Sequence, residues 1–358
     1  MRIEENKPLA PYTTFGIGGP ARWFVEAASE DEIVEATGWA RERGVPLFVL
    51  GGGSNLLVAD RGFDGLVLKV GLKGIRVYRN DHPKGEPGDP WGYDVAAGED
   101  WEHFVQRTIE DKCSGIECLA GIPGTVGGTP VQNVGAYGQE VSSTIGSVRV
   151  FDLEEGVFRL FLNVECGFTY RKSRFNTVDR GRYVVTSVTF GLRPGGAPTV
   201  GYPDLQRAIE KSGTKGRQAT LTEIAAVVRQ VRQAKGMLLV EGDPDCRSAG
   251  SFFKNPVVGE EQVRRIAEAG GKEPPTFPAG VDQVGQVKVP AAWLIEQAGF
   301  SRGYALGAAG ISSRHTLALI NRGGATAADI LVLAGRISRA VEARFGIELE
   351  MEPVMLGF

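Results

Sequence analysis

The sequence has few cysteines and histidines and no long apolar run. The four cysteines (Cys113, Cys118, Cys166 and Cys246) include no CxxC pair and are too few for a disulfide scaffold, so we expect reduced, buried thiols. The three histidines form no cluster with cysteines or carboxylates at metal-ligand spacing, which predicts no metal site. No stretch approaches the ~18 apolar residues that span a bilayer, and the charged N-terminus lacks the apolar core of a signal peptide. We therefore expect a cytoplasmic protein that does not bind membranes.

Composition narrows the class of protein further. A net charge of −3 gives no electrostatic reason to expect nucleic acid as a partner. A length of 358 residues, with 42% apolar and 23% charged residues, is typical of a globular protein with two or three domains. The 50 glycines represent about twice the average usage. They cluster at the ends of apolar runs, which predicts tight turns and places where backbone closely approaches a ligand.

The first part of the chain predicts a strand, a helix and a second strand that leads into a glycine loop. Residues 22–27 favour a strand, and Ser29 with Glu32 forms a capping-box pattern that opens a helix. The apolar run 46–50 favours a buried strand that delivers the chain to GGGSN at 51–55. This order of elements is the one used for nucleotide binding.

The rest of the chain predicts a mixture of helices and antiparallel strands. The expected elements are a strand at 65–70, a polar loop at 81–90, a helix at 101–112 capped by Asp100, strands between 145 and 193, a helix at 221–235, a long loop at 236–248 and a helix from Thr326 to Gly346. The stretch GGAPTVGYP at 195–203 combines a composition shift with turn residues, and it predicts an internal boundary.

Two glycine-rich segments are candidates for cofactor binding. In GGGSN the three glycines leave backbone N–H groups unshielded, and Ser54 and Asn55 add donors, so the loop can wrap a pyrophosphate; a plain turn is the alternative. The segment GIPGTVGGTPVQNVGAYG at 121–138 is apolar and stiffened by prolines, whereas a disordered linker would be polar and rich in serine. It predicts ordered backbone against a flat ligand, with a multi-turn connection as the alternative.

A series of motifs resembles the UDP-N-acetylenolpyruvoylglucosamine reductase (MurB) family of bacterial cell-wall synthesis. They occur in the family's order and span nearly the whole chain: TTFGIGGPA (13–21), VLGGGSNLL (49–57), LAGIPGTVGGTPVQNVGAYGQE (119–140), YRKSRF (170–175), AGSFFKNP (249–256), GISSRH (310–315) and ELEMEPVMLG (348–357). GSFFKNP together with GIPGTVGG is a very specific combination.

The resemblance implies an α+β fold. It consists of a two-part FAD-binding fold of the vanillyl-alcohol-oxidase/cresol-methylhydroxylase type, followed by an α/β substrate-binding domain. We expect FAD-binding subdomains at 1–72 and 73–197 and a substrate domain at 198–358, and it stays open whether the last strand returns to the FAD domain. The positions that the resemblance assigns to the cofactor are Gly51, Gly52, Gly53, Ser54, Asn55, Gly124, Thr125, Gly127, Gly128 and Gly135.

The resemblance also implies the reaction. NADPH reduces FAD, and reduced FAD converts the enolpyruvyl ether of UDP-N-acetylglucosamine enolpyruvate to the lactyl ether of UDP-N-acetylmuramate, a peptidoglycan precursor. Such a reduction needs a hydride, a proton and stabilisation of an enolate-like charge in a water-poor site. Flavin is the hydride carrier, because no side chain can do that work. No histidine lies between residues 1 and 81, which favours non-covalent FAD, and we expect a monomer.

Three residues correspond to the family's catalytic positions. Ser251 matches the proton donor, although without the family it would be interpreted as a helix cap or turn residue. Arg171 matches the charge-stabilising arginine, whose rigid fork suits a carboxylate; Lys172 and Arg174 lie close by, and a solvated basic turn is the alternative. Glu352 matches the active-site glutamate.

The assignment of the glutamate depends on the C-terminal motif. Glu348, Glu350 and Glu352 alternate with apolar residues, and in a strand they would share one face. Aligning the terminal glycine selects Glu352. Pro353 departs from the family's pattern, so Glu350 stays open as an alternative, whereas Glu348 is better explained as part of a solvated face.

Five further positions correspond to substrate contacts in the family. Tyr202 lies on a loop that some members use to cover the nucleotide, where it could stack on uracil or be a core tyrosine. Lys235 matches a lysine that contacts the diphosphate, and Tyr137 and Asn255 match other substrate contacts. His315 falls where some relatives have glutamine.

Two other functions fit parts of the sequence. One is an oxidase on the same FAD fold, which in many cases binds flavin covalently through a histidine near the first glycine loop. The other is a nucleotide-sugar-binding protein without turnover. That second function predicts the loss of Ser251, Arg171 or Glu352, and all three are present.

Overall fold

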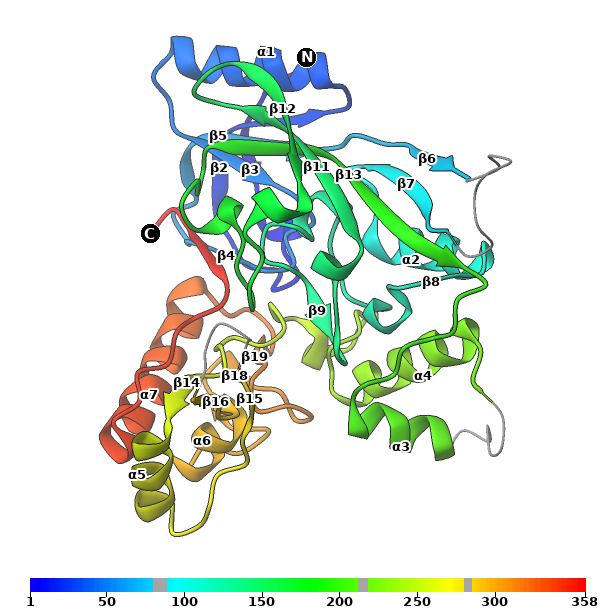
Figure 1. Ribbon diagram of the computed structural model, residues 1–358. Coiled ribbons are helices and arrows are strands. Elements are labelled where there is room, and N and C mark those ends of the chain that lie inside the picture. The colour runs from blue at the N-terminus through cyan, green and yellow to red at the C-terminus, as the bar shows by residue number, and fades with distance from the viewer. Residues whose placement is uncertain (80–88, 212–217, 280–284) are drawn as a thin grey trace. The chain divides into compact units, whose positions relative to one another are not determined.

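The computed structural model describes residues 1–79, 89–211, 218–279 and 285–358 (Figure 1). The chain divides into two compact units. Unit 1 comprises Met1–Lys7, Ala21–Gly52 and Asp64–Gln233, and unit 2 comprises Pro8–Pro20, Gly53–Phe63 and Ala234–Phe358. The domain boundaries expected at residues 72 and 197 stay a prediction. Of the polar loop expected at 81–90, residues 81–88 lie outside the described ranges.

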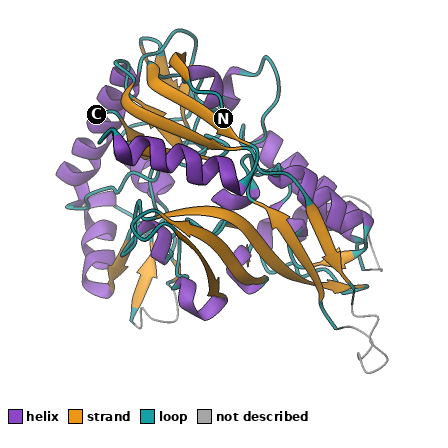
Figure 2. Ribbon diagram, turned by 90° about the horizontal axis from the view of Figure 1, so that it is seen from above, coloured by secondary structure: helices purple, strands orange, loops and turns teal. Residues whose placement is uncertain are grey.

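Unit 1 is built on two sheets (Figure 2). The first has the strand order β1-β2-β5-β3, with β1 (Glu4–Pro8), β2 (Pro20–Ala27), β5 (Phe63–Val70) and β3 (Leu47–Leu50), and α1 (Glu30–Glu42) connects β2 to β3. β3 and β5 are parallel. The second has the order β12-β11-β13-β7-β6, with β12 (Val157–Leu162), β11 (Ile145–Asp152), β13 (Tyr183–Pro194), β7 (Trp91–Ala96) and β6 (Ile75–Tyr78). Its neighbours pair antiparallel, as the sequence predicts for 145–193.

Unit 1 also contains short strands and helices that come before, within and after the long glycine-rich segment in the sequence. They are α2 (Trp101–Glu110), β8 (Cys113–Ser114), the short strands β9 (Gly135–Ala136) and β10 (Gln139–Glu140), α3 (Pro203–Lys211) and α4 (Leu221–Ala234). Trp101, at the start of α2, is fully buried, and its indole N–H donates to the Leu119 carbonyl at 3.1 Å. This bond fixes the backbone just before the glycine-rich segment begins.

Capping side chains explain where two helices of unit 1 begin. Ser29 accepts the Glu32 N–H at 3.2 Å, so the predicted start of α1 is confirmed. The Glu32 carboxylate bonds to the Ala28 N–H at 2.7 Å, so the returning bond of the predicted capping box reaches one residue further back. Asp100 accepts the His103 N–H at 2.9 Å and caps α2, which ends at Glu110, two residues before the predicted end.

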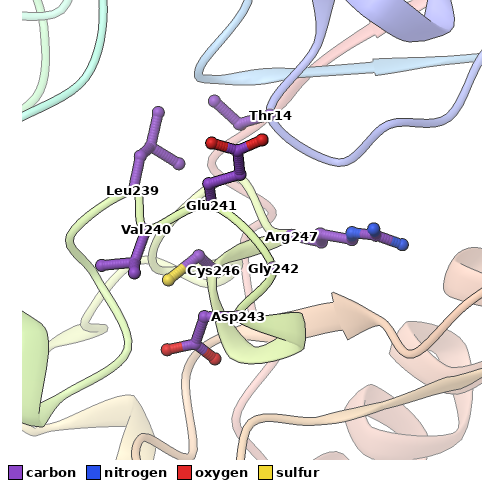
Figure 3. Close-up of a pocket in the computed structure, with 8 residues that line it drawn as sticks. All are labelled: Thr14, Leu239, Val240, Glu241, Gly242, Asp243, Cys246 and Arg247. Atoms are coloured by element: carbon purple, nitrogen blue, oxygen red, sulfur yellow. The ribbon is translucent and has the colours of Figure 1, made fainter.

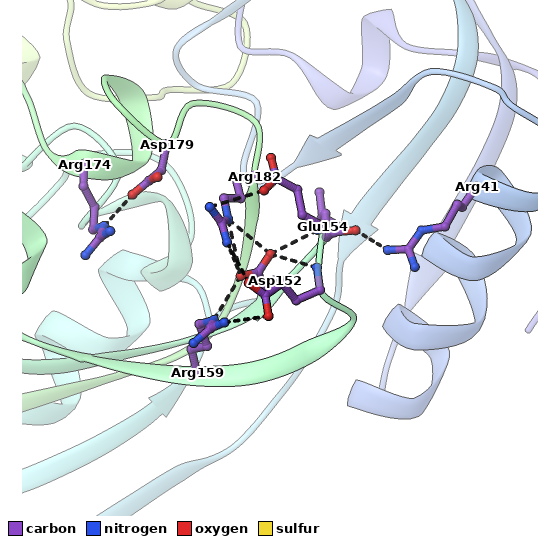
Figure 4. Close-up of polar contacts among 9 residues, drawn as sticks. Arg41, Asp152, Glu154, Arg159, Arg174, Asp179 and Arg182 are labelled. Atoms are coloured by element: carbon purple, nitrogen blue, oxygen red, sulfur yellow. Dashed lines mark hydrogen bonds and ion pairs between the residues drawn. The ribbon is translucent and has the colours of Figure 1, made fainter.

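A buried carboxylate ties the β11–β12 hairpin to β13 (Figure 4). The Asp152 side chain is fully buried at the end of β11, and it accepts hydrogen bonds from Arg182 at 2.9 Å and Arg159 at 3.0 Å. It also accepts the backbone N–H groups of Glu154 and Glu155. The hydrogen bond from Arg182 is the main cause that holds the pKa of Asp152 well below its usual range. The hairpin is therefore fixed by an ionised group.

In its described residues, unit 2 contains small sheets and the α-helices α5, α6 and α7. Its elements are β4 (Leu56–Val58), β14 (Val257–Gly259), α5 (Glu260–Gly270), β15 (Phe277–Pro278), β16 (Gln286–Lys288), α6 (Ala291–Gln297), β17 (Ala305–Leu306), β18 (Ala309–Ile311), β19 (Leu319–Asn321), α7 (Ala327–Phe345) and β20 (Val354–Leu356). The last strand, β20, pairs in parallel with β4, which comes directly after the first glycine loop. Phe15, Ile17 and Leu57 belong to the same buried cluster as residues of α6 and α7.

The final helix agrees closely with its sequence pattern. Thr326 and Asp329 bond reciprocally at the start of α7, and Gly346 ends it with a φ of 65°. One face of the helix is buried, and it consists of Ile330, Leu333, Ala334, Ile337, Val341 and Phe345. Of the helices in the described residues, none is long and apolar enough to cross a membrane.

The prediction of a strand at the C-terminal motif, residues 348–352, is wrong. Ile347 and Leu349 are buried and Glu348 is exposed, as alternation requires, but these residues form no ladder. Only an isolated bridge joins Met351 to Phe253, and Met351 is itself exposed. The alternation arises because the extended chain packs its apolar residues against unit 2 without a neighbouring strand. Regular pairing begins at Val354.

Candidate functional site

The two glycine-rich segments meet in unit 1. A Cβ added to Gly52 would lie 2.5 Å from the Gly124 Cα, so a side chain at this position would push the two backbones apart. The neighbouring Gly51 faces the Thr125 hydroxyl, at 3.0 Å from the position of its Cβ. Residues that are about seventy positions apart by their numbers thus form one surface of exposed backbone. The sequence pattern predicts that each segment binds the cofactor, but it does not show that the two segments touch.

This surface fits the phosphates of FAD. The Thr125 Oγ1 atom is buried and has no hydrogen-bond partner among the described residues. A buried polar atom without a partner is costly, and a bound ligand can satisfy it. Backbone that glycines leave bare is suited to closely approach a phosphate. Gly51, Gly52, Gly124 and Thr125 are therefore the residues that would hold the pyrophosphate.

The other predicted cofactor glycines of the 121–138 segment differ in their surroundings. A Cβ on Gly127 would lie 2.5 Å from that of Ala97, and one on Gly135 would lie 2.7 Å from Glu140. Both positions require glycine for packing within the protein. A Cβ on Gly128 would meet nothing within 4 Å, so this exposed glycine leaves room for a ligand.

The end of the first glycine loop belongs to unit 2. Gly53 has a φ of +63°, and a Cβ there would lie 1.8 Å from the Tyr12 carbonyl oxygen. The Gly53 carbonyl accepts the Thr14 N–H at 3.2 Å, and the Ser54 carbonyl accepts the Thr14 hydroxyl at 3.4 Å. Asn55 bonds elsewhere: its side-chain N–H donates to the Glu352 carbonyl at 3.3 Å. The loop thus connects to the C-terminal motif.

Ser251 lies on an irregular segment whose neighbours are firmly held. Gly250 before it has a φ of +72°, and Phe252 after it is fully buried. Phe252 donates its N–H to the Leu317 carbonyl at 2.8 Å and accepts the Glu352 N–H at 2.9 Å. Ser251 is half-buried, caps no helix, and its hydroxyl makes no hydrogen bond to the described residues. The backbones of Ser251 and Glu352 are therefore adjacent within unit 2.

The two candidate glutamates have different surroundings. Glu350 is exposed, and its carboxylate pairs with Lys254 at 2.5 Å. Glu352 is half-buried, and its backbone N–H and carbonyl bond to Phe252 and Asn55. The surface ion pair with Lys254 accounts for an acidic residue at position 350 without a catalytic role. Glu352 has the more constrained position.

Arg171 differs from its basic neighbours in unit 1. It has a positive φ of 57°, and its guanidinium donates to the Gly135 carbonyl at 2.9 Å. Arg174 is bonded to Asp179 at 2.6 Å and covers the Phe161 ring at 4.0 Å, while Lys172 is exposed. Of these three cations, Arg171 is the one that contacts the glycine-rich segment.

Two tyrosines and a second arginine gather at the same segment. The rings of Tyr137 and Tyr202 meet edge to face, with centroids 6.0 Å apart. Arg232, near the end of α4, donates to the Gly121 carbonyl at 3.0 Å and hydrogen-bonds to Tyr137. Burial is the main cause that lowers its pKa, and the nearby charge of Arg171 acts in the same direction. Sequence reasoning missed Arg232; its position one helical turn before Lys235 is the signal that could have found it.

The other predicted substrate residues belong to unit 2. Asn255 uses its side-chain oxygen to accept the Ala291 N–H at 3.0 Å, at the start of α6. The His315 Nδ1 atom accepts the Leu317 N–H at 3.1 Å, so Nε2 carries the proton and can donate. Burial, followed by the positive charge of Lys235, lowers the pKa of His315 to about 4. The imidazole is therefore neutral at physiological pH, and it can donate a hydrogen bond as a glutamine amide does.

A cavity of about 260 Å³ lies in the long loop after Lys235 (Figure 3). It is lined by Thr14, Leu239, Val240, Glu241, Gly242, Asp243, Cys246 and Arg247. Arg314 holds this loop through Asp243 at 2.7 Å. None of the predicted site residues lines the cavity. The described residues also include no group of three or more histidines, cysteines and carboxylates arranged to hold a metal ion.

Comparison with known proteins identifies the family of the chain. An FAD binding domain model matches residues 21–160, and a model of the UDP-N-acetylenolpyruvoylglucosamine reductase C-terminal domain matches residues 243–356. The chain is 46% identical to a protein of that name from Thermobifida fusca, over 98% of this chain and 97% of the relative. It is 44% identical to one from Streptomyces coelicolor, over 98% and 90%.

A solved structure of the same kind of reductase, from Thermus caldophilus, matches with a TM-score of 0.66 and 27% identity over 99% of both chains. Together with the match to the FAD binding domain, this similarity confirms the predicted α+β fold and its FAD-binding part.

Proposed function

Because the chain belongs to the UDP-N-acetylenolpyruvoylglucosamine reductase family, we propose that it reduces UDP-N-acetylglucosamine enolpyruvate to UDP-N-acetylmuramate, with FAD as its cofactor. The observation that carries the proposal is the contact between Gly52 and Gly124 beside the buried Thr125 hydroxyl. A surface of this kind suits a dinucleotide phosphate. When bound, FAD supplies the hydride that adds to one vinyl carbon of the substrate.

Ser251 supplies the proton to the neighbouring carbon. Ser251 is half-buried, and its hydroxyl makes no hydrogen bond to the described residues, which supports this role. The carbanion-like carbon is a strong base, so placement of the donor matters more than its acidity. Glu352, whose N–H donates to the carbonyl of the residue after Ser251, is the active-site glutamate in this proposal. Arg171 stabilises the negative charge that develops on the substrate carboxylate.

The nucleotide part of the substrate is bound by other side chains. Tyr137 and Tyr202 provide aromatic surface for the uracil, and their mutual ring contact supports this assignment. Lys235 provides positive charge for the diphosphate. His315 and Asn255 provide hydrogen bonds, with His315 acting as a neutral donor.

NADPH is the source of reducing equivalents in this proposal, and it uses the same pocket as the sugar nucleotide in turn. The reaction belongs to peptidoglycan precursor synthesis. A cytoplasmic location is supported by the four cysteines, all free and buried. Mutual competition between NADPH and the enolpyruvyl substrate in steady-state kinetics is expected; formation of a ternary complex would contradict the shared pocket.

The decisive experiment separates the two half-reactions of the purified, FAD-loaded protein. We expect NADPH to bleach the flavin in wild type and in Ser251→Ala at similar rates. Reoxidation of the reduced flavin by UDP-N-acetylglucosamine enolpyruvate should be slower in Ser251→Ala by roughly 100-fold or more. Ser251→Cys should restore part of that rate, because a thiol can also donate a proton. Ser301→Ala, at an exposed serine of unit 2, is the matched control and should behave as wild type.

Two outcomes would contradict the proposal in different ways. Near-normal reoxidation in Ser251→Ala would exclude Ser251 as the proton donor and leave the activity intact. An oxidase would be favoured by a different set of results. The enolpyruvyl sugar nucleotide would then fail to reoxidise the wild-type flavin, a sugar or alcohol would reduce it, and oxygen would reoxidise it rapidly.

A further inference from the structure

Asn55 holds the backbone on both sides of a single residue, Pro353. Its side-chain N–H donates to the Glu352 carbonyl at 3.3 Å. Its own carbonyl accepts the Val354 N–H at 2.9 Å. Pro353 between them is buried and has no N–H to donate. The chain from Glu352 to Val354 is therefore tied to the end of the first glycine loop by one residue.

The other polar group of the Glu352 backbone is also used. Its N–H donates to the Phe252 carbonyl at 2.9 Å. Phe252 is fully buried, and its ring packs edge to face on Phe15 at 6.3 Å and Phe253 at 5.3 Å. Two hydrogen bonds therefore hold the Glu352 backbone. The first support is the bond to Phe252, on the segment that carries Ser251, and the second support is the bond from the Asn55 side chain. The first support is rigid because an aromatic cluster holds it.

The second support depends on the chemistry of the Asn55 side chain. Among side chains of the size of asparagine, only the amide can donate a hydrogen bond to the Glu352 carbonyl from this position. Aspartate would place a carboxylate oxygen against the Glu352 carbonyl, where two acceptors repel, and alanine would leave the carbonyl without this donor. The loop itself is anchored beneath Asn55, since Gly53 touches the Tyr12 backbone and bonds to Thr14. A sequence-based interpretation assigned Asn55 to the cofactor, whereas its side-chain bond reaches Glu352.

We propose that Asn55 is a positioning residue for Glu352, and that it aligns this carboxyl group for the step that follows hydride transfer. The inference rests on the proposed function, in which Glu352 acts beside Ser251. A displacement of about 1 Å at a reacting group can cost about 100-fold in rate. Because Gly51, Gly52, Gly124 and Thr125 are untouched by a change at Asn55, flavin binding should be kept.

The test compares Asn55→Ala and the isosteric Asn55→Asp with wild type in the FAD-loaded full chain. We expect flavin content, the visible flavin spectrum and the rate of reduction by NADPH to stay within about twofold of wild type. Reoxidation by UDP-N-acetylglucosamine enolpyruvate should slow by about 10- to 100-fold. In steady state this appears as a lower kcat with little change in the KM of the enolpyruvyl substrate.

A double-mutant cycle separates positioning from general loss of structure. In a Glu352→Gln background, Asn55→Ala should cause little further loss of the reoxidation rate, because the group through which Asn55 acts is already changed. Asn163→Ala is the matched control. The Asn163 amide donates to the carbonyls of Ser142 and Ile145 in unit 1, so its loss should lower stability and leave both half-reactions unchanged.

The outcomes that overturn the inference are distinct from a failure of the proposed function. Wild-type reoxidation rates in both Asn55 variants, or additive losses in the cycle, would show that Asn55 does not act through Glu352. Loss of flavin from both variants would assign Asn55 to cofactor binding instead. If reduced wild-type flavin were not reoxidised by the sugar nucleotide at all, the proposed function would fail, whatever the Asn55 variants did.

Discussion

At the scale of single residues, His315 shows how burial sets a protonation state. Its folded-state pKa of about 4 lies below the ~6.5 of an unfolded histidine. Above pH ~6.5 the imidazole is neutral in both states, so its titration contributes nothing there. As the pH falls from ~6.5 towards 4, the unfolded chain binds the proton first, and the folded state loses stability. The same neutrality lets Nε2–H act as a donor at physiological pH.

We therefore expect His315→Gln to remove part of the acid sensitivity of the protein. Between about pH 7 and pH 5 the free energy of unfolding of wild type should fall more steeply than that of the variant. Urea unfolding followed by tryptophan fluorescence at several pH values measures this difference. Parallel curves would mean that His315 is protonated equally easily in both states.

Gly53 and Gly44 form a natural pair for testing the first glycine loop. Their φ angles are +63° and +62°, but a Cβ on Gly53 would lie 1.8 Å from the Tyr12 carbonyl, while one on Gly44 would meet nothing within 4 Å. Gly44→Ala should cost about 1 kcal/mol through backbone strain alone. Gly53→Ala should cost more than about 2 kcal/mol, because the loop must also move. Thermal unfolding compares the two, and equal losses would refute the predicted close contact.

The site residues show which side chains a sequence can identify. Motif order is sufficient to nominate Arg171, but only the folded structure distinguishes it from Arg174, because the ion pair of Arg174 with Asp179 cannot be inferred from spacing. Arg232 was missed because an arginine near a helix end is an ordinary surface residue in sequence. Its contact with Gly121 depends on the packing of α4, which no local pattern encodes.

At the scale of elements, Asp152 tests how strongly one buried carboxylate holds a hairpin. Asp152→Asn removes the charge that Arg182 and Arg159 share, and it should cost on the order of 3 kcal/mol at neutral pH. The folded-state pKa is depressed, so the stabilisation is complete above the unfolded pKa of ~3.9 and is lost as the pH falls from there towards the folded value.

The difference in melting temperature between wild type and Asp152→Asn should therefore be constant above about pH 5 and shrink below about pH 4. Calorimetry across this range measures it. Arg22→Gln breaks an exposed pair with Asp64 at 2.9 Å and serves as the control, with a loss below about 1 kcal/mol. A constant difference down to pH ~2 would exclude a role for the Asp152 charge.

The helix caps differ in a way that predicts different losses. Thr326→Ala breaks a reciprocal capping box and should destabilise the protein by about 1 kcal/mol. Ser29→Ala should cost less, because it removes only the acceptor of the Glu32 N–H, whereas Thr326→Ala removes the acceptor of the Asp329 N–H and also the hydroxyl that donates to the Asp329 carboxylate. Chemical denaturation resolves the two values, and a larger loss for Ser29→Ala would contradict the comparison.

Elements were predictable where the signal is local. The caps at Ser29, Asp100 and Thr326 placed three helix starts correctly, since each cap bonds within one turn. The strand expected through Glu348 and Glu350 was wrong for the opposite reason. Alternating burial reports which side faces the protein, but a strand also needs a partner backbone, and the partner is decided by the whole fold.

At the scale of the whole molecule, unit 2 depends on residues from the beginning of the chain. Phe15 and Leu57 are fully buried in its hydrophobic cluster, and β4 pairs with β20. We expect a fragment of residues 234–358 to be largely unfolded on its own, because it lacks these residues and exposes the surface that they cover. Circular dichroism and cooperative unfolding of the fragment, compared with the full chain, test this. A cooperative transition in the fragment would show that the N-terminal segments are dispensable.

The parallel pairing of β4 with β20 also bears on synthesis. β4 leaves the ribosome long before its partner, β20, is made. Until β20 is made, Leu56–Val58 has no partner strand in this sheet, although its three residues are apolar and are buried in the folded protein. Nascent unit 2 is therefore expected to complete its folding only once β20 has left the ribosome, and to depend on chaperones until then.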